Sequence, residues 1–282
     1  MNFLLKCLLY TIMKLAGPQR AKKLIPAMAR GGGLYLLDVA YNNIGILKYE
    51  NSMVSGEHYL VTKVLAKNLG KIERPIMFDV GANVGTYSLL LSKVFPQAKI
   101  YAFEPNENTF KQLVVNVDSS VKCVNAGMGS EEKNAKIFTF ADDLTSTNAS
   151  IYGEMFRSYK KDDLVEIEIQ LTTLDLFCEH EGIKEIDFLK IDTEGNEHSV
   201  LRGENKMLTE GKVKIIQFEF GEYNVFSRVF LRDFYEILTD YNIYRLDSER
   251  LIPLFEYNLF NEIFRFQNLL AVRMDFPFDD RQ

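Results

Sequence analysis

From Pro75 onward, short apolar runs alternate with segments in which apolar residues recur at helical spacing. Runs of this length indicate buried strands, and the segments between them indicate helices. We expect strands at residues 76–80, 99–103, 121–125, 187–191, 213–220, 243–246 and 269–273, and helices at residues 86–95, 108–117, from about 196, and 232–241. This alternation predicts an α/β fold with a mostly parallel sheet and helices on both faces. Ligands bind such sheets beyond the carboxyl ends of the strands, so site residues are sought in those loops.

The first such loop, residues 79–86, reads DVGANVGT and joins a predicted strand to a predicted helix. Gly81 and Gly85 permit a tight turn and let a ligand approach the backbone. The amide groups at the start of the next helix favour polar or anionic groups. A dinucleotide fingerprint would need glycine where Asn83 and Thr86 stand, and no P-loop GK[ST] follows. The loop therefore disfavours NAD, FAD and P-loop nucleotide binding.

The second strand is closed by Glu104, 25 residues after Asp79. A carboxylate at this place can accept hydrogen bonds from both hydroxyls of a ribose. The competing interpretation is a surface carboxylate ahead of the turn at Pro105. The position at a strand end favours the binding role.

The fourth strand is followed by an acidic cluster in the run DFLKIDTEGNEH, residues 187–198. Asp192, Glu194 and Glu197 could crowd into one loop and one helical turn, and crowding raises the pKa of at least one carboxyl. Such a group is a candidate base near neutral pH. Acidic residues are also favoured in a first helical turn by the helix dipole alone, and we expect one of the three to do only that. His198, one turn into the helix, is more simply a packing residue, and no spacing of a metal site is present, so no metal is predicted.

Charge divides the chain into a basic lead-in and an acidic remainder. Up to Arg74 there are 11 basic and 4 acidic residues, a net of +7, whereas the rest carries −13. Residues 1–30 hold six basic residues and no acidic one. This asymmetry suggests a basic arm that meets an anionic surface.

The first 16 residues, MNFLLKCLLYTIMKLA, have an amphipathic helical pattern in which Lys6 and Lys14 belong to one polar stripe. The run is shorter than the ~20 apolar residues of a membrane-spanning helix. A cleaved signal peptide fits poorly, whereas a mitochondrial presequence stays open. The arm either packs on the domain or lies on a lipid surface.

The cysteines Cys7, Cys123 and Cys178 lie far apart and show no CxxC or metal spacing. We expect them to be free thiols in a reducing compartment. The predicted location is the cytoplasm, with the arm as the means of any peripheral attachment to a membrane.

The motifs together resemble one family. The segments FDVGANVGTYSLLLSK, YAFEPNENTFKQLVVNV, VNAGMGS, TTLDLFCEHEGIKEIDFLKIDTEGNEHSVLRG and IIQFEFGE are similar to those of FkbM-type methyltransferases, with KIDTEGNE the most specific. The resemblance covers about residues 55–272. It implies a class I methyltransferase fold, a Rossmann-like sheet, in residues 55–282, preceded by a basic helical arm and lead-in in residues 1–54.

The resemblance also implies S-adenosylmethionine as the cofactor and assigns residues to it. It carries the cofactor contacts over to Asp79, Gly81, Asn83, Gly85 and Glu104, and moderate candidates for adenine contacts to Asn125 and Gly127. It carries the methyl-transfer site over to Asp192, Glu194 and Glu197, with Glu219 as a weaker candidate.

The resulting hypothesis is a methyltransferase that acts on a hydroxyl oxygen of a sugar, glycan or secondary metabolite. The alternative is a non-catalytic, membrane-associated scaffold that retains the fold, and the intact Gly81, Gly85, Glu104 and Asp192 argue against it. Nucleic acid is disfavoured as a partner because the catalytic part is acidic and would repel phosphate. The acceptor, the identity of the base and the oligomeric state are left open.

Overall fold

The computed structural model describes residues 35–140, 150–154 and 164–280, together with a few isolated positions before residue 35. The amphipathic arm predicted in residues 1–30 therefore lies outside the described residues. Within the part that is described, no helix combines the length and the apolar character needed to cross a membrane.

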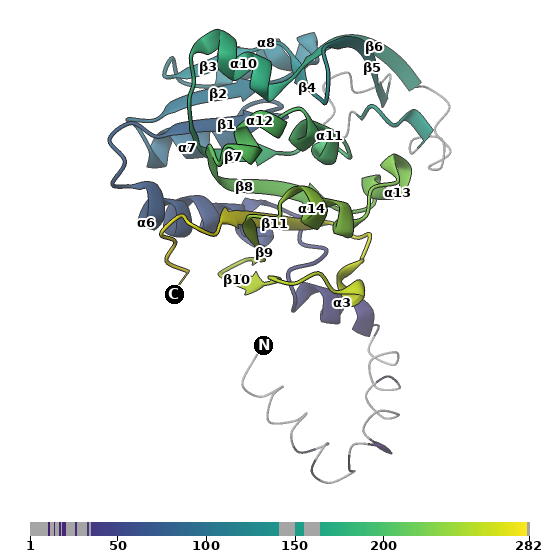
Figure 1. Ribbon diagram of the computed structural model, residues 1–282. Helices are drawn as coiled ribbons and strands as arrows, with labels where there is room; N and C mark the ends of the chain where they lie inside the picture. The colour runs from purple at the N-terminus through teal and green to yellow at the C-terminus, as the bar shows by residue number, and fades with distance from the viewer. Residues whose placement is uncertain are drawn as a thin grey trace.

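The described residues form a central eight-stranded sheet in the order β10-β9-β11-β8-β7-β1-β2-β3 (Figure 1). Strands β3, β2, β1, β7 and β8 run parallel, and β11 is antiparallel to both of its neighbours, β8 and β9. This confirms the predicted mostly parallel sheet of a class I methyltransferase fold. The strands are β1 (Ile76–Val80), β2 (Lys99–Phe103), β3 (Val121–Val124), β7 (Ile186–Ile191), β8 (Val213–Phe220), β9 (Tyr241–Asp247), β10 (Arg250–Pro253) and β11 (Gln267–Arg273).

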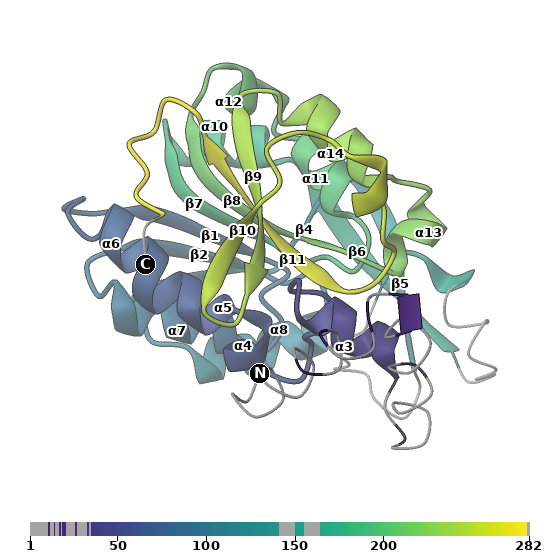
Figure 2. The ribbon, with the colours of Figure 1, turned by 90° about the horizontal axis from the view of Figure 1, so that it is seen from below.

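Helices cover both faces of this sheet, because successive strand residues point to opposite sides (Figure 2). In β1, Met77 packs with the helices η1, α6, α7 and α8, whereas Phe78 packs on the other face with α10, α11, α12 and α14. The first group is η1 (Leu60–Leu65), α6 (Ala66–Leu69), α7 (Thr86–Val94) and α8 (Glu107–Asn116). The second group is α10 (Leu174–Glu181), α11 (Glu197–Arg202), α12 (Asn205–Thr209) and α14 (Leu231–Ile237). The remaining short helices are α3 (Leu36–Asn42), α4 (Ser52–Ser55), α5 (Glu57–Tyr59), α13 (Tyr223–Ser227) and η2 (Leu259–Asn261).

A second, three-stranded sheet was not predicted from the sequence. It has the order β4-β6-β5, with β4 (Gly127–Met128) parallel and β5 (Lys133–Phe140) antiparallel to β6 (Leu164–Thr172). Ile137, Ile169 and Leu171 of this sheet are buried together. The small sheet follows β3 in the chain and supplies one side of the cavity described below.

The lead-in segment contacts the main sheet at β9. Ile46 is fully buried, Lys48 forms an ion pair with Asp247, and the Leu47 amide donates to the Phe266 carbonyl. A Cβ on Gly45 would lie 2.3 Å from the Leu246 carbonyl oxygen. This segment therefore packs on the domain, and the boundary predicted at residue 55 stays a prediction.

Candidate functional site

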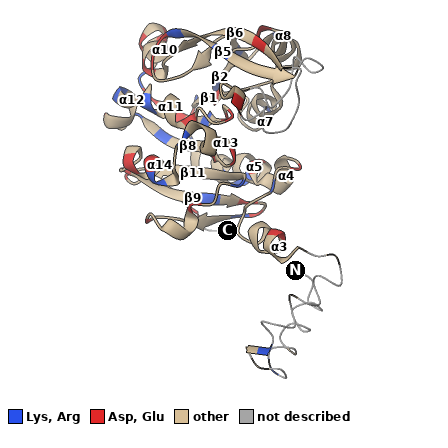
Figure 3. Ribbon diagram, turned by 90° about the vertical axis from the view of Figure 1, so that its right-hand side faces the viewer, with Lys and Arg blue, Asp and Glu red and all other residues tan. Residues whose placement is uncertain are grey.

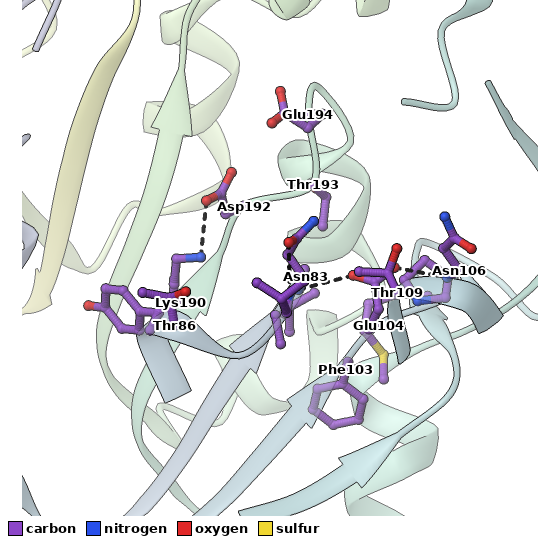
Figure 4. Close-up of a pocket in the computed structure, with 18 of the residues that line it drawn as sticks. Asn83, Thr86, Phe103, Glu104, Asn106, Thr109, Lys190, Asp192, Thr193 and Glu194 are labelled. Carbon is purple, nitrogen blue, oxygen red and sulfur yellow. Dashed lines mark hydrogen bonds and ion pairs between the residues drawn. The ribbon is translucent and has the colours of Figure 1, made fainter. Parts of the chain in front are cut away.

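A cavity of about 680 Å³ lies beyond the carboxyl ends of β1, β2 and β7 (Figure 4). Its wall combines the loop after β1, the start of α7, the segment 103–109, residues 126–128, and the loop after β7. The small sheet adds Ile137, Ile169 and Leu171, and the lead-in adds residues 51, 52, 57 and 58. The cavity is thus at the edge where the fold class places its ligands.

The glycine loop after β1 is held against two neighbours. Gly81 has a φ of +79°, its amide donates to the Phe103 carbonyl, and a Cβ there would lie 1.8 Å from the Asp192 carbonyl oxygen. Gly85 has a φ of +91° and would place a Cβ 2.5 Å from Val117 Cγ1. Only glycine fits these positions, because a side chain would be strained and would collide. The loop backbone is consequently fixed, with Asn83 also at a positive φ of 49°.

Glu104 lines the cavity at the end of β2 and is buried. One carboxylate oxygen accepts from the Asn106 amide at 2.9 Å, and the other accepts from the Asn83 amide at 3.0 Å. Burial raises the pKa of Glu104 to about 7, although the two amide hydrogen bonds oppose the rise. Since a carboxylate oxygen can accept more than one hydrogen bond, each oxygen of Glu104 can accept a further one from a ligand in the cavity.

Asp79, Gly85 and Asn125 do not line the cavity, unlike Gly81, Asn83 and Gly127. Asp79 is fully buried, accepts from Ser88 Oγ at 2.7 Å and lies 3.4 Å from Lys190 Nζ. The Asn125 amide group donates to the Glu104 carbonyl at 2.8 Å and so braces the backbone of the neighbouring strand end. The cofactor contacts expected of these two side chains stay predictions, and their observed contacts are with the protein.

Three carboxyl groups meet at the ends of β7 and β8. Carboxyl oxygens of Asp192, Glu194 and Glu219 lie within 4.8 Å of one another, and the first two residues line the cavity. Burial, followed by the facing Glu194, raises the pKa of Glu219 well above its ordinary value. Burial and then Asp192 raise the pKa of Glu194 in the same way. The absence of a metal expected from the sequence stays a prediction.

Glu197 is buried and faces the loop rather than the cavity. Its Oε1 accepts from the Thr193 amide at 2.8 Å, the Thr193 hydroxyl at 3.1 Å and the Gly195 amide at 3.1 Å. Burial raises its pKa to about 7 against these hydrogen bonds. These contacts give it the role of holding the loop, and the place in the methyl-transfer site that the resemblance assigned to it stays a prediction. His198 packs its ring edge on Phe234.

The chain matches the model of the methyltransferase FkbM domain over residues 79–246. This match covers more than half of the chain and contains both the glycine loop and the carboxyl cluster. The chain belongs to the FkbM methyltransferase family. The match confirms the resemblance carried by the sequence motifs.

Curated relatives of this FkbM-family chain are remote. It is 30% identical to methyltransferase sdnD of Sordaria araneosa over 156 residues, covering 46% of this chain and 60% of the relative. It is 26% identical to hexuronic acid methyltransferase AglP of Haloferax volcanii, covering 53% and 58%. It is 29% identical to 31-O-demethyl-FK506 methyltransferase FkbM of Streptomyces tacrolimicus, covering 45% and 58%. The chain thus spans less than two thirds of the length of these relatives.

Sequence reasoning missed several residues of the site. Lys190 is buried, lines the cavity and donates to Asp192 Oδ2 at 3.0 Å. Residues two apart in a strand share a face, so the spacing from Asp192 to Lys190 was a usable signal. Glu57 also lines the cavity, 19 residues before β1 begins, and the family resemblance, which starts at about residue 55, assigned it no role. Asn106 and Thr109 in the Glu104 wall are further examples.

Proposed function

We propose that this chain is a methyltransferase that uses S-adenosylmethionine and transfers the methyl group to a hydroxyl oxygen of a sugar or another small molecule. One observation carries the proposal: a single cavity joins a carboxylate able to accept from hydroxyls, Glu104, to the carboxyl cluster at Asp192. The first suits the ribose of a cofactor, and the second suits the proton transfer of an acceptor hydroxyl. Membership of the FkbM methyltransferase family supports the reaction class.

The residues of the cavity fit the proposed cofactor. Glu104 keeps accepting capacity on both oxygens, as two ribose hydroxyls require. Ile137, Ile169 and Leu171 form an apolar wall beside Gly127, which suits a flat base. A volume of about 680 Å³ falls in the range of small-molecule sites and leaves room for a second ligand. In this assignment, the cofactor is held by Gly81, Asn83, Glu104 and Gly127.

The chemistry needs a nucleophilic oxygen, and the chain supplies the group that takes its proton. When bound, S-adenosylmethionine supplies an electrophilic methyl group and leaves as S-adenosylhomocysteine. Burial and their carboxyl neighbours raise the pKa values of Glu194 and Glu219 well above the ordinary value, which makes them poorer candidates for the base. Asp192 lines the cavity and lies 3.0 Å from the Lys190 ammonium. Asp192 is therefore the proposed base, which accepts the hydroxyl proton as the oxygen attacks.

The acceptor class follows from the relatives and from the charge of the chain. One relative is named for hexuronic acid and another for a 31-O-demethyl compound, so a hydroxyl acceptor is the simplest proposal. The chain from Pro75 onward carries a net charge of −13, which would repel phosphate and disfavours nucleic acid as the acceptor. Acidic and basic residues are interspersed over the described elements (Figure 3). A cytoplasmic protein with its basic arm on a lipid surface remains part of the proposal.

Cofactor binding is tested by calorimetric titration of the full chain with S-adenosylmethionine. Glu104→Ala should weaken binding, because two hydroxyl donors lose a charged acceptor; a loss of about 1.5–3 kcal/mol is expected. Glu107→Ala is the matched control, since Glu107 lies one turn on, is exposed and pairs only with Lys111 among the contacts described for it. Folded wild-type protein that binds no S-adenosylmethionine contradicts the proposal.

Methyl transfer is tested with methyl-labelled cofactor and with glycan, lipid and small-molecule extracts as the acceptors. Label on an oxygen of a compound that carried a hydroxyl group there supports the proposal. Asp192→Asn is the negative control, which should transfer little label. Binding of the cofactor without transfer to any extract, together with retention of the chain on vesicles, would favour the scaffold alternative.

A further inference from the structure

The interior of the cavity holds a charged group that the assigned roles do not use. Lys190 comes from the middle of the central sheet, on β7, and its side chain is 5% exposed. An ammonium group removed from water costs several kcal/mol unless partners compensate for it. The partners of Lys190 therefore show what the residue is for.

Lys190 lies between two carboxylates from adjacent strand ends. Its Nζ is 3.0 Å from Asp192 Oδ2 and 3.4 Å from Asp79 Oδ1. Asp79 is fully buried at the end of β1, and the Asp192 side chain is 35% exposed on the cavity side. The ammonium thus links the inner carboxylate of Asp79 to that of Asp192, which faces the ligand space. Figure 4 shows the pair of Lys190 and Asp192.

The Tyr87 ring lies against the ammonium group, and hydrogen bonds hold that ring in place. Nζ stands over the Tyr87 ring at 4.9 Å from its centroid, a distance at which a cation and an aromatic face attract. The Tyr87 hydroxyl donates to Gln217 Oε1 at 2.5 Å, and the Gln217 amide group donates to Asn268 at 3.2 Å and to Glu57 at 3.3 Å. The ring is therefore anchored to β8, β11 and α5, so the lysine above it has one well-supported position.

We propose that Lys190 is a positioning residue of the transfer site, which holds the Asp192 carboxylate in place and oriented toward the cavity. The inference rests on the proposed function, because it gives Asp192 its task. Lys190 itself does not exchange a proton. Burial lowers its pKa, but Asp192, Asp79 and Glu57 together outweigh burial, so the pKa is raised and the ammonium persists.

The need for this cation follows from the groups that surround Asp192. The titratable and charged groups that face it come from six elements: Asp79 of β1, Glu57 of α5, Tyr87 of α7, Lys190 of β7, Glu219 of β8 and Glu194 and Glu197 of the loop and first turn of α11. All except Lys190 are acids. Without the ammonium, Asp192 would have no positive neighbour in this set.

The test compares the acid titration of Asp192 with and without the lysine. The carboxyl carbons of aspartate are labelled with ¹³C, the Asp192 signal is assigned with Asp192→Asn, and its midpoint is followed by NMR. In Lys190→Met we expect the midpoint to rise by about 1–3 pH units, the effect of losing an opposite charge at this distance. The acid limb of methyl transfer to the acceptor fraction should move by the same amount, and turnover should fall more than affinity for S-adenosylmethionine.

Lys190→Met leaves Asp79 as a buried charge without its cation, so the variant could fail to fold. The double variant Asp79→Asn/Lys190→Met removes both inner charges and should give the same shift of the Asp192 midpoint. Lys214→Met is the matched control: Lys214 pairs with Asp187 at 2.7 Å at the other end of β7, and neither residue lines the cavity. It should leave the midpoint unchanged.

An Asp192 midpoint that stays within error of wild type in both Lys190 variants overturns the inference. Failure of the proposed function gives a different result, since wild-type protein would then bind no S-adenosylmethionine while the titration still reports the coupling between Lys190 and Asp192.

Discussion

Two buried glutamates at strand ends, Glu104 after β2 and Glu219 in β8, have opposite surroundings. Glu104 receives hydrogen bonds from two backbone amides, at 3.0 and 2.9 Å. Glu219 faces other carboxyl groups, those of Asp192 and Glu194. Burial raises both pKa values, to about 7 for Glu104 but well above the ordinary value for Glu219, where like charges add to burial.

The difference separates the cavity into two ends with different chemistry. At the Glu104 end, two backbone amides limit the rise in pKa that burial causes, and the pKa of Glu104 is about 7. Hydrogen bonds from ligand hydroxyls would then favour the ionised carboxylate. At the other end, three carboxyl groups crowd together, and Asp192 is the one that pairs with the Lys190 ammonium. The proposed binding end thus has backbone amides around its carboxylate, and the proposed proton-transfer end has carboxyl neighbours.

The largest effect is expected from removing the anion at the proton-transfer end. Asp192→Asn keeps the shape of the side chain but cannot take a proton, so methyl transfer should fall by about 10²–10⁴-fold. Affinity for S-adenosylmethionine, measured by calorimetry, should change far less. Turnover at the wild-type rate would remove Asp192 from the mechanism.

The neighbouring acid provides the comparison for this variant. Burial and the neighbouring Asp192 raise the pKa of Glu194, which favours its neutral form, so Glu194→Gln should cost much less activity than Asp192→Asn. A greater loss in Glu194→Gln than in Asp192→Asn would show that the base has been assigned to the wrong carboxyl.

A smaller effect, on stability, is expected at the point where the two ends touch. Gly81→Ala would place a Cβ 1.8 Å from the Asp192 carbonyl oxygen in a backbone with a φ of +79°. Gly182→Ala has a similar φ of +66° at the end of α10 but meets nothing within 4 Å. In urea unfolding, backbone strain alone should lower the free energy of unfolding of Gly182→Ala by about 1–2 kcal/mol. Gly81→Ala should lower it clearly more, because the backbone at Asp192 must also move. Equal losses would mean that the two loops are not rigidly joined.

The sequence predicted the main sheet well because its buried strands are short apolar runs separated by helical patterns. The predicted strand 76–80 matches β1, and 187–191 differs from β7 by one residue. It missed the small sheet, although LVEIEIQLT in β6 alternates apolar and polar residues, a signal that was available. Its position in the fold, between β3 and α10, could not be read from periodicity.

The candidate site was predicted to the level of loops, and not to the level of atoms. A strand end places Asp79, Glu104 and Asp192 at one edge, but their side chains differ in direction: Asp79 points into the protein. The Glu197 carboxylate likewise accepts hydrogen bonds from the Thr193 and Gly195 amides. Such choices depend on contacts between strands far apart in sequence, which a motif does not contain.

The smallest effect, and the one that most sharpens the comparison, is a pH dependence at the binding end. The folded-state pKa of Glu104, about 7, lies above its ordinary value of 4.5. In the free protein, its contribution to stability is therefore complete below pH 4.5 and is lost as the pH rises through about 7. Glu104→Gln should lack that decline, which urea unfolding at several pH values measures.

Cofactor binding should depend on pH in the opposite direction, because ribose hydroxyls donate to the ionised carboxylate. Wild-type affinity for S-adenosylmethionine should rise with pH and level off above about 7. Glu104→Gln should bind S-adenosylmethionine about 10–100-fold more weakly at high pH, because it loses hydrogen bonds to a charged acceptor. Its affinity should also show little pH dependence. Glu107→Gln, which changes an exposed acid in the next turn, should follow wild type. If the affinity of Glu104→Gln still climbs through pH 7, another group governs the binding end, and the contrast with Glu219 no longer explains the division of the cavity.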